Sequence, residues 1–451
     1  MKFRKTAFIC GTLIAGLAAV SLFAAEKIFP YPYIQEDLPN GLRLITIPTD
    51  YPNLVSVFIV VGTGSRNEVE PGKSGFAHLF EHLMFRGTPE FSSARYQSEL
   101  ANAGAASNAS TSDDLTVYHT TFSKEDLPKI LSMEADRFQH LDVSPADFKT
   151  ETLAVLGEYN KNSASPTSKL SETVRATAFK VHTYQHTTMG FLKDIQAMPD
   201  EYEYSKQFFD RYYRPEYTTI IVAGDVDPKK VRALVDERWA TWKRGSYKPA
   251  IPAEPPQDGP RSAHIDWPSP TLPWVEVAYR APAYSDTSEE TAALDAISRL
   301  GFSQTSPLYQ KLVIEEQKAD SLSASPPDNL DPELFDVRVR VKNAADLASI
   351  QQQVIATAEA FASTPVDPMK LESLKQRVRN QFALRLNDSE SIANTVARFV
   401  ALRRTPQTIN DYYDTYAKLT PADIQTAAQK YLNAKSRTVV TLTSLAPAGA
   451  K

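Results

Sequence analysis

The residues best suited to chemistry in this 451-residue sequence are His78, Glu81 and His82. They form a His-x-x-Glu-His pattern, and apolar residues fill most other positions between 74 and 85. The spacing of the apolar residues predicts an α-helix, on which residues four apart share one face, so both imidazoles can point at one spot. Two imidazoles suit a divalent transition metal, zinc first. A carboxylate beside a metal-bound water is the base that a hydrolase needs.

A second helical segment offers a third ligand. Glu151 and Glu158 are seven residues apart, which is two helical turns, so they share one face. Two such glutamates taken alone usually lie on a solvated helix face. A catalytic zinc site, however, uses three protein ligands and keeps one position open for water. We therefore expect one of these carboxylates to bind the metal and the other to support a ligand from behind.

Two further segments have residues that could belong to a site. His182 and His186 also have four-residue spacing, but they lack a suitably placed acid and precede a loop-like sequence that ends at Gly190, so we expect neither to bind the metal. Residues 104–122 begin small and polar and then alternate like a strand. As an edge strand, this segment could pair with an extended peptide through main-chain hydrogen bonds; a plain sheet strand is the alternative interpretation.

The N-terminus has the layout of a secretory signal peptide. A basic start at residues 2–5 precedes a largely apolar run over 7–25 that ends in small residues. We expect residues 1–25 to be a signal peptide cleaved near Ala24 or Ala25, with export to the periplasm. An uncleaved membrane anchor is the alternative, because the run is just long enough to span a bilayer.

The composition is that of a water-soluble globular chain, 42% hydrophobic and 23% charged with a net charge of −5. No basic block or stripe stands out, so a nucleic-acid partner has no electrostatic support. Cys10 is the only cysteine and lies in the signal, so core packing must stabilise the mature chain without disulfides.

A proline-rich stretch divides the chain. Residues 246–273 hold eight prolines and predict an extended linker between an N-terminal lobe at 26–245 and a C-terminal lobe at 274–451. The halves repeat one plan, with a strand, a loop and a helix near the start of each and a further strand near the end. The corresponding segments are strands 54–61 and 274–279, the helices at 74–85 and 291–300, and strands 218–223 and 437–442. The fold class is therefore α+β with two homologous lobes, and the second lobe lacks the His-x-x-Glu-His pattern.

Three short sequences resemble those of the pitrilysin/insulinase metallopeptidases, an inverzincin family. They are Asn40-Gly-Leu-Arg-Leu, Val61-Gly-Thr-Gly-Ser-Arg-Asn-Glu68 and the segment from Gly75 to Thr88. The length and paired lobes are most similar to the branch of the mitochondrial processing peptidase and its bacterial relatives. The resemblance covers nearly the whole mature chain.

The resemblance implies a complete site. One zinc ion per chain would be held by His78, His82 and a glutamate 76 residues after the second histidine, which is Glu158. Glu151 would support the site, and Glu81 would be the general base. The implied substrate strand is Asn108, Ala109, Ser110, Thr111 and Ser112. The implied fold is two roll-like lobes that form half of a clamshell around an unfolded peptide.

One departure from the family pattern concerns the partner. The family places an Arg and a Tyr in the second half of the clamshell, but Pro307 and Asp320 occupy the matching places here, and neither can donate hydrogen bonds as Arg and Tyr would. We therefore expect a zinc peptidase subunit that pairs with a sister subunit lacking the zinc motif, although a homodimer stays open. A non-catalytic assembly or chaperone-like subunit is the first alternative, and a two-lobed periplasmic solute-binding protein is the second.

Overall fold

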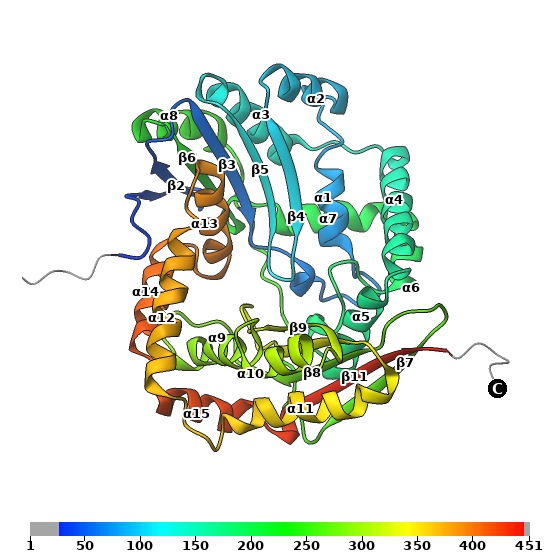
Figure 1. Ribbon diagram of the computed structural model, residues 1–451. Helices are drawn as coiled ribbons and strands as arrows, with labels where there is room; N and C mark the ends of the chain where they lie inside the picture. Colours follow the sequence, from blue (N-terminus) through cyan, green and yellow to red (C-terminus); the bar gives the residue numbers. More distant parts are fainter. Residues whose placement is uncertain (1–26, 446–451) are drawn as a thin grey trace, which may run out of the picture.

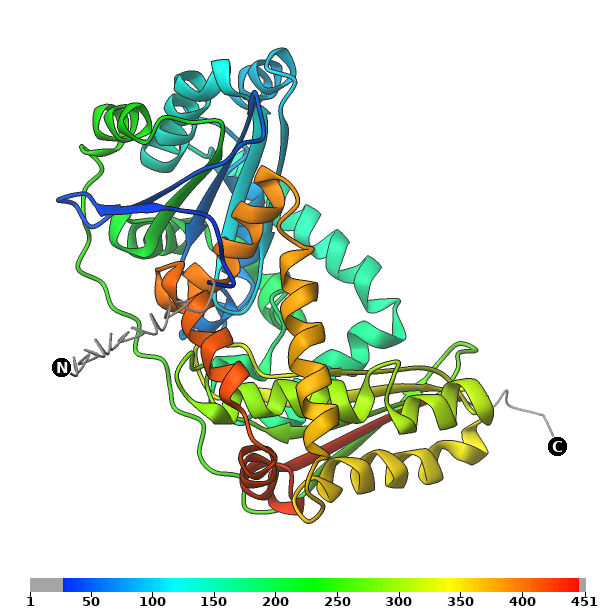
Figure 2. The same ribbon diagram turned by 60° about the vertical axis from the view of Figure 1, so that its left-hand side comes forward.

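The structure, a computed structural model, describes residues 27–445, and the signal peptide predicted over 1–25 lies outside them. Two β-sheets, each with its own helices, form an upper and a lower lobe in Figures 1 and 2. The α+β class and the two lobes predicted from the sequence are therefore confirmed. Within residues 27–445, no helix is long and apolar enough to cross a membrane.

The first sheet has six strands and one open edge that matters for the site. In spatial order the strands are β1 (Ile34–Asp37), β2 (Arg43–Pro48), β6 (Thr218–Gly224), β3 (Leu54–Val61), β5 (Thr116–Ser123) and β4 (Ala106–Thr111). The central strand β3 is an apolar run that is buried apart from its first residue, as expected for a strand covered on both faces. Strand β4 pairs only with β5 and forms the edge.

The second sheet repeats this order strand by strand without a counterpart of β1. Its strands are β7 (Arg261–Trp267), β11 (Arg437–Ser444), β8 (Trp274–Arg280), β10 (Leu334–Val341) and β9 (Ala319–Ser325). In both sheets the parallel pair comes at the same place, β2 with β6 and β7 with β11, and the other shared pairs are antiparallel. Edge strand β9 is thus the counterpart of β4.

Strand β7 lies inside residues 246–273, the stretch that we predicted as a linker. Its residues alternate between half-buried and exposed, because β7 is an edge strand that pairs only with β11. The nearest prolines, Pro260 and Pro268, lie just outside the strand, so none removes a hydrogen-bond donor from it. The extended connection therefore ends before residue 261.

The helices of the first half pack mainly on one face of the first sheet, around a core that includes Phe80, Phe138 and Phe208. These helices are α1 (Phe76–Leu83), α2 (Ser93–Asn102), α3 (Leu127–His140), α4 (Pro145–Ser163), α6 (Leu192–Ala197), α7 (Tyr202–Tyr212) and α8 (Pro228–Trp239). The second lobe has α9 (Glu289–Phe302), α10 (Pro307–Tyr309), α11 (Leu347–Ala360), α12 (Pro368–Ala383), α14 (Gln407–Lys418) and α15 (Pro421–Tyr431).

Two helices cross between the halves. Helix α5 (Pro166–Ala178) belongs to the first half but packs on β7, β8 and β11 of the second sheet. Helix α13 (Ser389–Arg403) belongs to the second half but packs on β3 and β6 of the first sheet. A division of the chain at the linker, as predicted, separates each of these helices from the sheet that it covers.

Candidate metal centre

Helix α1 is held at its N-terminus by a buried carboxylate. Glu68 accepts hydrogen bonds from the backbone N–H groups of Gly75 and Ala77, both at 2.7 Å. These amides are among those that a helix start leaves unpaired. Burial raises the pKa of Glu68 to about 8, and the two amide hydrogen bonds act in the opposite direction. Gly75 has φ 91°, and a Cβ there would come within 2.7 Å of the Met189 carbonyl oxygen, so the turn into α1 requires glycine.

The same helix is fixed along its length by the sheet behind it. The Tyr118 hydroxyl of β5 lies 3.1 Å from the Phe80 carbonyl oxygen of α1 and 2.7 Å from the Tyr213 hydroxyl. Both tyrosines are buried. Because α1 is bonded at its start and at its middle, the side chains on its other face are presented in one orientation.

The three predicted ligands come together between α1 and α4. His78 Nε2 lies 3.5 Å from Glu158 Oε2, and His82 Nε2 lies 3.6 Å from the same oxygen. One ligand atom from each of the three residues lies within 4.8 Å of the other two. Two imidazole nitrogens and one carboxylate oxygen form a donor set that suits zinc and leaves a fourth position for water. In the part of the chain that the structure describes, this is the group suited to a metal.

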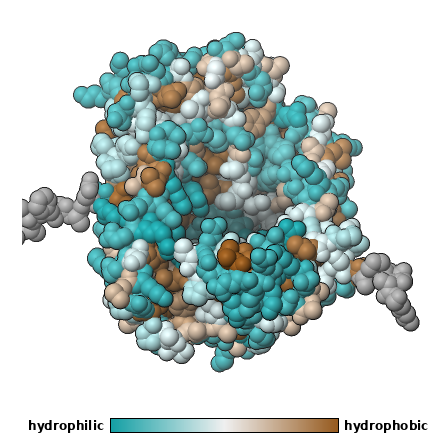
Figure 3. All heavy atoms as spheres, viewed as in Figure 1, coloured by the Kyte–Doolittle hydropathy of each residue, from teal (hydrophilic) through white to brown (hydrophobic). Residues whose placement is uncertain are grey.

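The site is buried on one side and open on the other. His78 is 8% exposed, whereas the Glu158 side chain is 37% exposed, so solvent reaches the group from the side of α4. Burial, followed by the charge of His82, lowers the pKa of His78. The His78 ring is therefore neutral near pH 7, the form in which its nitrogens can bind a metal. Figure 3 shows the surface hollowed between the two lobes.

Glu151, which we predicted to support a ligand, lies next to His82. His82 Nδ1 is 3.4 Å from Glu151 Oε2, and Arg86 forms an ion pair with the other oxygen of Glu151. A proton on Nδ1, directed at this carboxylate, leaves the Nε2 lone pair free on the side of Glu158. Glu151 is buried, with His82 beside one oxygen and the cation of Arg86 beside the other.

The candidate base contacts the candidate substrate strand directly. The Thr111 hydroxyl donates a 2.7 Å hydrogen bond to Glu81 Oε2. Asn108, Ala109, Ser110 and Thr111 lie in β4, whereas Ser112 follows the strand, and its N–H bonds to the Leu115 carbonyl in the turn to β5. The free edge of β4 therefore ends at the carboxylate of Glu81.

His182 and His186, which we expected not to bind the metal, have hydrogen-bond partners outside the group of His78, His82 and Glu158. His182 accepts a hydrogen bond on Nδ1 from the Tyr184 N–H, so its Nε2 carries the proton and donates to Asp331 at 3.0 Å. His186 Nδ1 lies 2.9 Å from the Thr187 carbonyl oxygen.

The two residues that depart from the family pattern lie in the second lobe. Asp320 lies on β9 and pairs with Arg340 at 3.2 Å, and Pro307 begins α10.

Sequence reasoning missed three residues of this site, namely Glu68, Arg86 and the side chain of Thr111. Glu68 and Arg86 lie inside the segments that carry the family resemblance, and that location is the one sequence feature that could have pointed to them. Glu68, however, bonds to backbone amides, and Arg86 pairs with Glu151, which is far along the chain. Residue spacing alone could therefore not assign either of them a role.

Two imidazoles and a carboxylate on packed helices, with a further carboxylate that contacts an edge strand, are the arrangement expected of a metal-dependent peptide hydrolase. Residues 43–191 match the insulinase family, peptidase family M16, and residues 201–378 match the M16 inactive domain. The zinc protease PqqE of Helicobacter pylori is 30% identical over 414 residues, which cover 90% of this chain and 91% of that protein. The chain belongs to the M16 (insulinase) family, which confirms the resemblance.

Other relatives and solved structures agree. The mitochondrial-processing peptidase subunit beta of Blastocladiella emersonii is 21% identical over 89% of this chain and 87% of its own length. The crystal structure of a protease from Helicobacter pylori has a TM-score of 0.85 at 28% identity, covering 92% of this chain and 99% of that one. The periplasmic protease PqqL from Escherichia coli shares the fold, with a TM-score of 0.74 at 18% identity over 92% of this chain and 49% of PqqL.

Proposed function

We propose that this chain is an exported zinc peptidase subunit that hydrolyses unfolded peptides. The observation that carries the proposal is the bond between Glu81 and Thr111, because it places a base at the end of an open edge strand. Glu81 lies on the same helix as His78 and His82, next to the donor set completed by Glu158. Relatives named as zinc proteases support the choice of metal.

His78, His82 and Glu158 would hold the zinc ion, which supplies Lewis acidity for activating a water and polarising a carbonyl. Glu81 accepts the proton of the attacking water and returns it to the leaving amine. Thr111 holds one oxygen of Glu81, so the other oxygen is oriented for proton transfer. The backbone of β4 pairs with the substrate and sets its distance from Glu81.

A sister subunit is part of the proposal. Neither Pro307 at the start of α10 nor Asp320, which pairs with Arg340, offers a hydrogen-bond donor to a developing oxyanion. A homologous chain that bears the family's Arg and Tyr would supply those donors. Full peptidase activity of the purified chain alone would show that this partner is unnecessary.

Export follows from the layout of residues 1–25 and would take the mature chain to the periplasm, the compartment named for PqqL. N-terminal sequencing of the protein recovered from cells tests this point. A new N-terminus near residue 26 is expected, and an intact Met1 would favour the uncleaved anchor.

The central experiment combines metal analysis with a quenched-peptide assay in the presence and absence of a chelator. We expect about one zinc per chain and chelator-sensitive cleavage once the partner is supplied. Glu81→Gln should keep the metal and lose turnover by roughly 10²–10⁴-fold. A metal-free chain with no activity would favour a non-catalytic assembly subunit, and near-normal turnover of Glu81→Gln would remove Glu81 from the role of base.

A further inference from the structure

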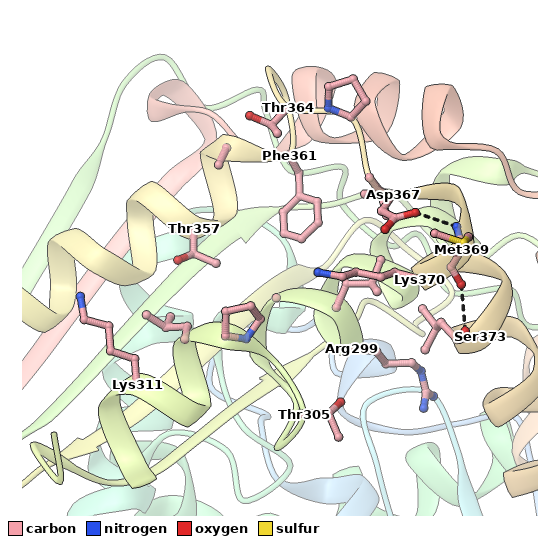
Figure 4. A pocket seen from close by; sticks show the side chains of 18 of the residues that line it. Arg299, Thr305, Lys311, Thr357, Phe361, Thr364, Asp367, Met369, Lys370 and Ser373 are labelled. Atoms are coloured by element: carbon pink, nitrogen blue, oxygen red, sulfur yellow. Dashed lines mark hydrogen bonds between the residues drawn. The ribbon is translucent and has the colours of Figure 1, made fainter. Parts of the chain in front are cut away.

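The second lobe has an open cavity beside α9, the helix that corresponds to α1 of the first lobe. Helix α9 follows central strand β8 as α1 follows β3, and it packs beside edge strand β9 and helix α12 as α1 packs beside β4 and α4. A cavity of about 1160 Å³ lies among α9, α10, α11 and α12. Figure 4 shows it from close by.

The cavity is lined mainly by apolar side chains. Leu308 and Leu374 are buried in its wall, Phe361 lies across it, and Met369 stands 77% exposed at its rim. A Cβ on Gly301 would come within 3.0 Å of the Phe361 ring, so glycine allows this ring to lie against α9. An apolar concavity of this size, with a few polar groups, is typical of a ligand site.

The charge around the cavity is positive. Four cationic side chains line it against one carboxylate, namely Arg299, Lys311, Lys370 and Arg377 against Asp367. The Asp367 carboxylate caps α12 by accepting the Met369 N–H at 2.8 Å, and Arg299 pairs with Asp295 at 2.8 Å.

Lys370 is the cation available to a ligand. Across residues 27–445 it makes no hydrogen bond or ion pair, and Figure 4 shows it directed into the cavity. A lysine aimed over an apolar surface with no protein partner is suited to a ligand that carries both an anionic group and an apolar body.

We propose that this cavity binds a small amphipathic carboxylate. The apolar tail lies against Phe361, Leu308 and Leu374, and the carboxylate pairs with Lys370. A medium-chain fatty acid and the C-terminal carboxylate of a short hydrophobic peptide share this chemistry. The site does not require the metal group of the first lobe, so it stands whether or not the proposed peptidase function does.

The test is calorimetric titration of the full mature chain with decanoate, with N-acetyl-Leu-Phe and with the C-terminal amide of that dipeptide. One saturable site per chain is expected for a carboxylate, and the amide should bind about tenfold more weakly or worse. Lys370→Glu should weaken carboxylate binding by roughly tenfold or more. Lys342→Glu, at an exposed position of the same lobe outside the cavity, should leave it unchanged.

A second variant tests the cavity without changing charge. Ala356 is exposed on α11 and lines the cavity, so Ala356→Trp should fill it and abolish binding of either carboxylate while circular dichroism stays native. Tighter binding of decanoate would identify a lipid-derived acid as the ligand of the cavity, and tighter binding of the dipeptide would identify a peptide C-terminus.

Three binding results would overturn the proposal, and so would one result on the oligomeric state. They are the absence of saturable binding up to about 1 mM, equal affinity for the acid and the amide, and wild-type affinity in either Lys370→Glu or Ala356→Trp. A concentration-dependent dimer that Ala356→Trp abolishes would also overturn it, because a second copy of the chain would then cover the cavity.

Discussion

The two lobes share the order of five strands but carry different side chains on the corresponding helices. In the first lobe, α1 and α4 bring His78, His82 and Glu158 within ligand distance of one another. In the second lobe, α9 and α12 flank an apolar cavity with a cationic lining. The corresponding helix pairs, α1 with α4 and α9 with α12, therefore carry a metal-type group in one lobe and border an apolar cavity in the other, and their side chains decide the chemistry of each.

The edge strands differ in the same way. Thr111 at the end of β4 bonds to Glu81, whereas Asp320 near the start of β9 bonds to Arg340 on the neighbouring strand. One strand is therefore tied to the candidate base, and the other only to its own sheet. Substitutions at matched positions of the two lobes can separate scaffold from site.

The largest difference should follow from removing the proposed zinc ligand on α4. Glu158→Gln should weaken zinc binding by more than the roughly 10–100-fold expected for a supporting residue, because the donor set loses its only carboxylate. Competition with a zinc-binding dye measures this affinity. Glu372→Gln, on the equivalent helix α12, removes an exposed glutamate that pairs with Lys375 and should leave zinc affinity unchanged.

A smaller loss should follow from disturbing the support of His82. Arg86→Met removes the cation beside Glu151, which leaves a buried carboxylate uncompensated, and zinc affinity should fall by roughly 10–100-fold. The same dye competition measures it, with the exposed Arg95→Met as the control. Unchanged affinity in Arg86→Met would mean that Glu151 orients His82 without help.

Edge strand β4 is tested by Thr111→Val, which keeps the β-branched shape and loses the hydrogen bond to Glu81. Peptide turnover should fall about tenfold, which is equivalent to about 1.4 kcal/mol, because one hydrogen bond to a charged group is lost. A control change on the other edge strand, Ser323→Ala at an exposed position of β9, should have no effect on kcat. Equal kcat values in the two variants would contradict the role given to Thr111.

The last prediction concerns stability rather than the site, through the pH dependence of a carboxyl group of the second half. Burial raises the pKa of Glu333 to about 7, although Arg175 at 3.5 Å opposes the rise. The folded state therefore holds this proton more tightly than the unfolded state, so the free energy of unfolding falls as pH rises from about 4.5 to 7. Glu333→Gln should remove roughly 1–3 kcal/mol of that fall in urea titrations. The control Glu237→Gln, at an exposed position, should leave the fall unchanged. If the free energy of unfolding of Glu333→Gln still fell with pH as in the wild type, the prediction would be contradicted.

Much of the fold could be predicted because its signals are local. The apolar run 54–61 is strand β3, and the His-x-x-Glu-His segment is helix α1. Strand β7 was missed because its polar edge pattern stands between prolines, which indicate a linker when read alone. The duplication itself was the better guide, since β2 in the first sheet requires an equivalent strand in the second.

The site was predictable only as far as its residues share a helix or a strand. Spacing placed His78 with His82 and Glu151 with Glu158, and the structure brings the two pairs together. The bond from Thr111 to Glu81 joins residues 30 positions apart and depends on how α1 packs against β4. Such a contact is set by tertiary packing, which periodicity does not report.

The crossing of α5 and α13 makes the two halves of the gene product interdependent. A fragment that ends before the linker would expose the apolar face of its sheet that α13 covers, and the complementary fragment would lack α5. Each piece alone should therefore aggregate, whereas co-expressed pieces should reassemble into a nicked but native particle. The loop before residue 261 is accordingly a place to build a split reporter, and not a place to cut out an independent module.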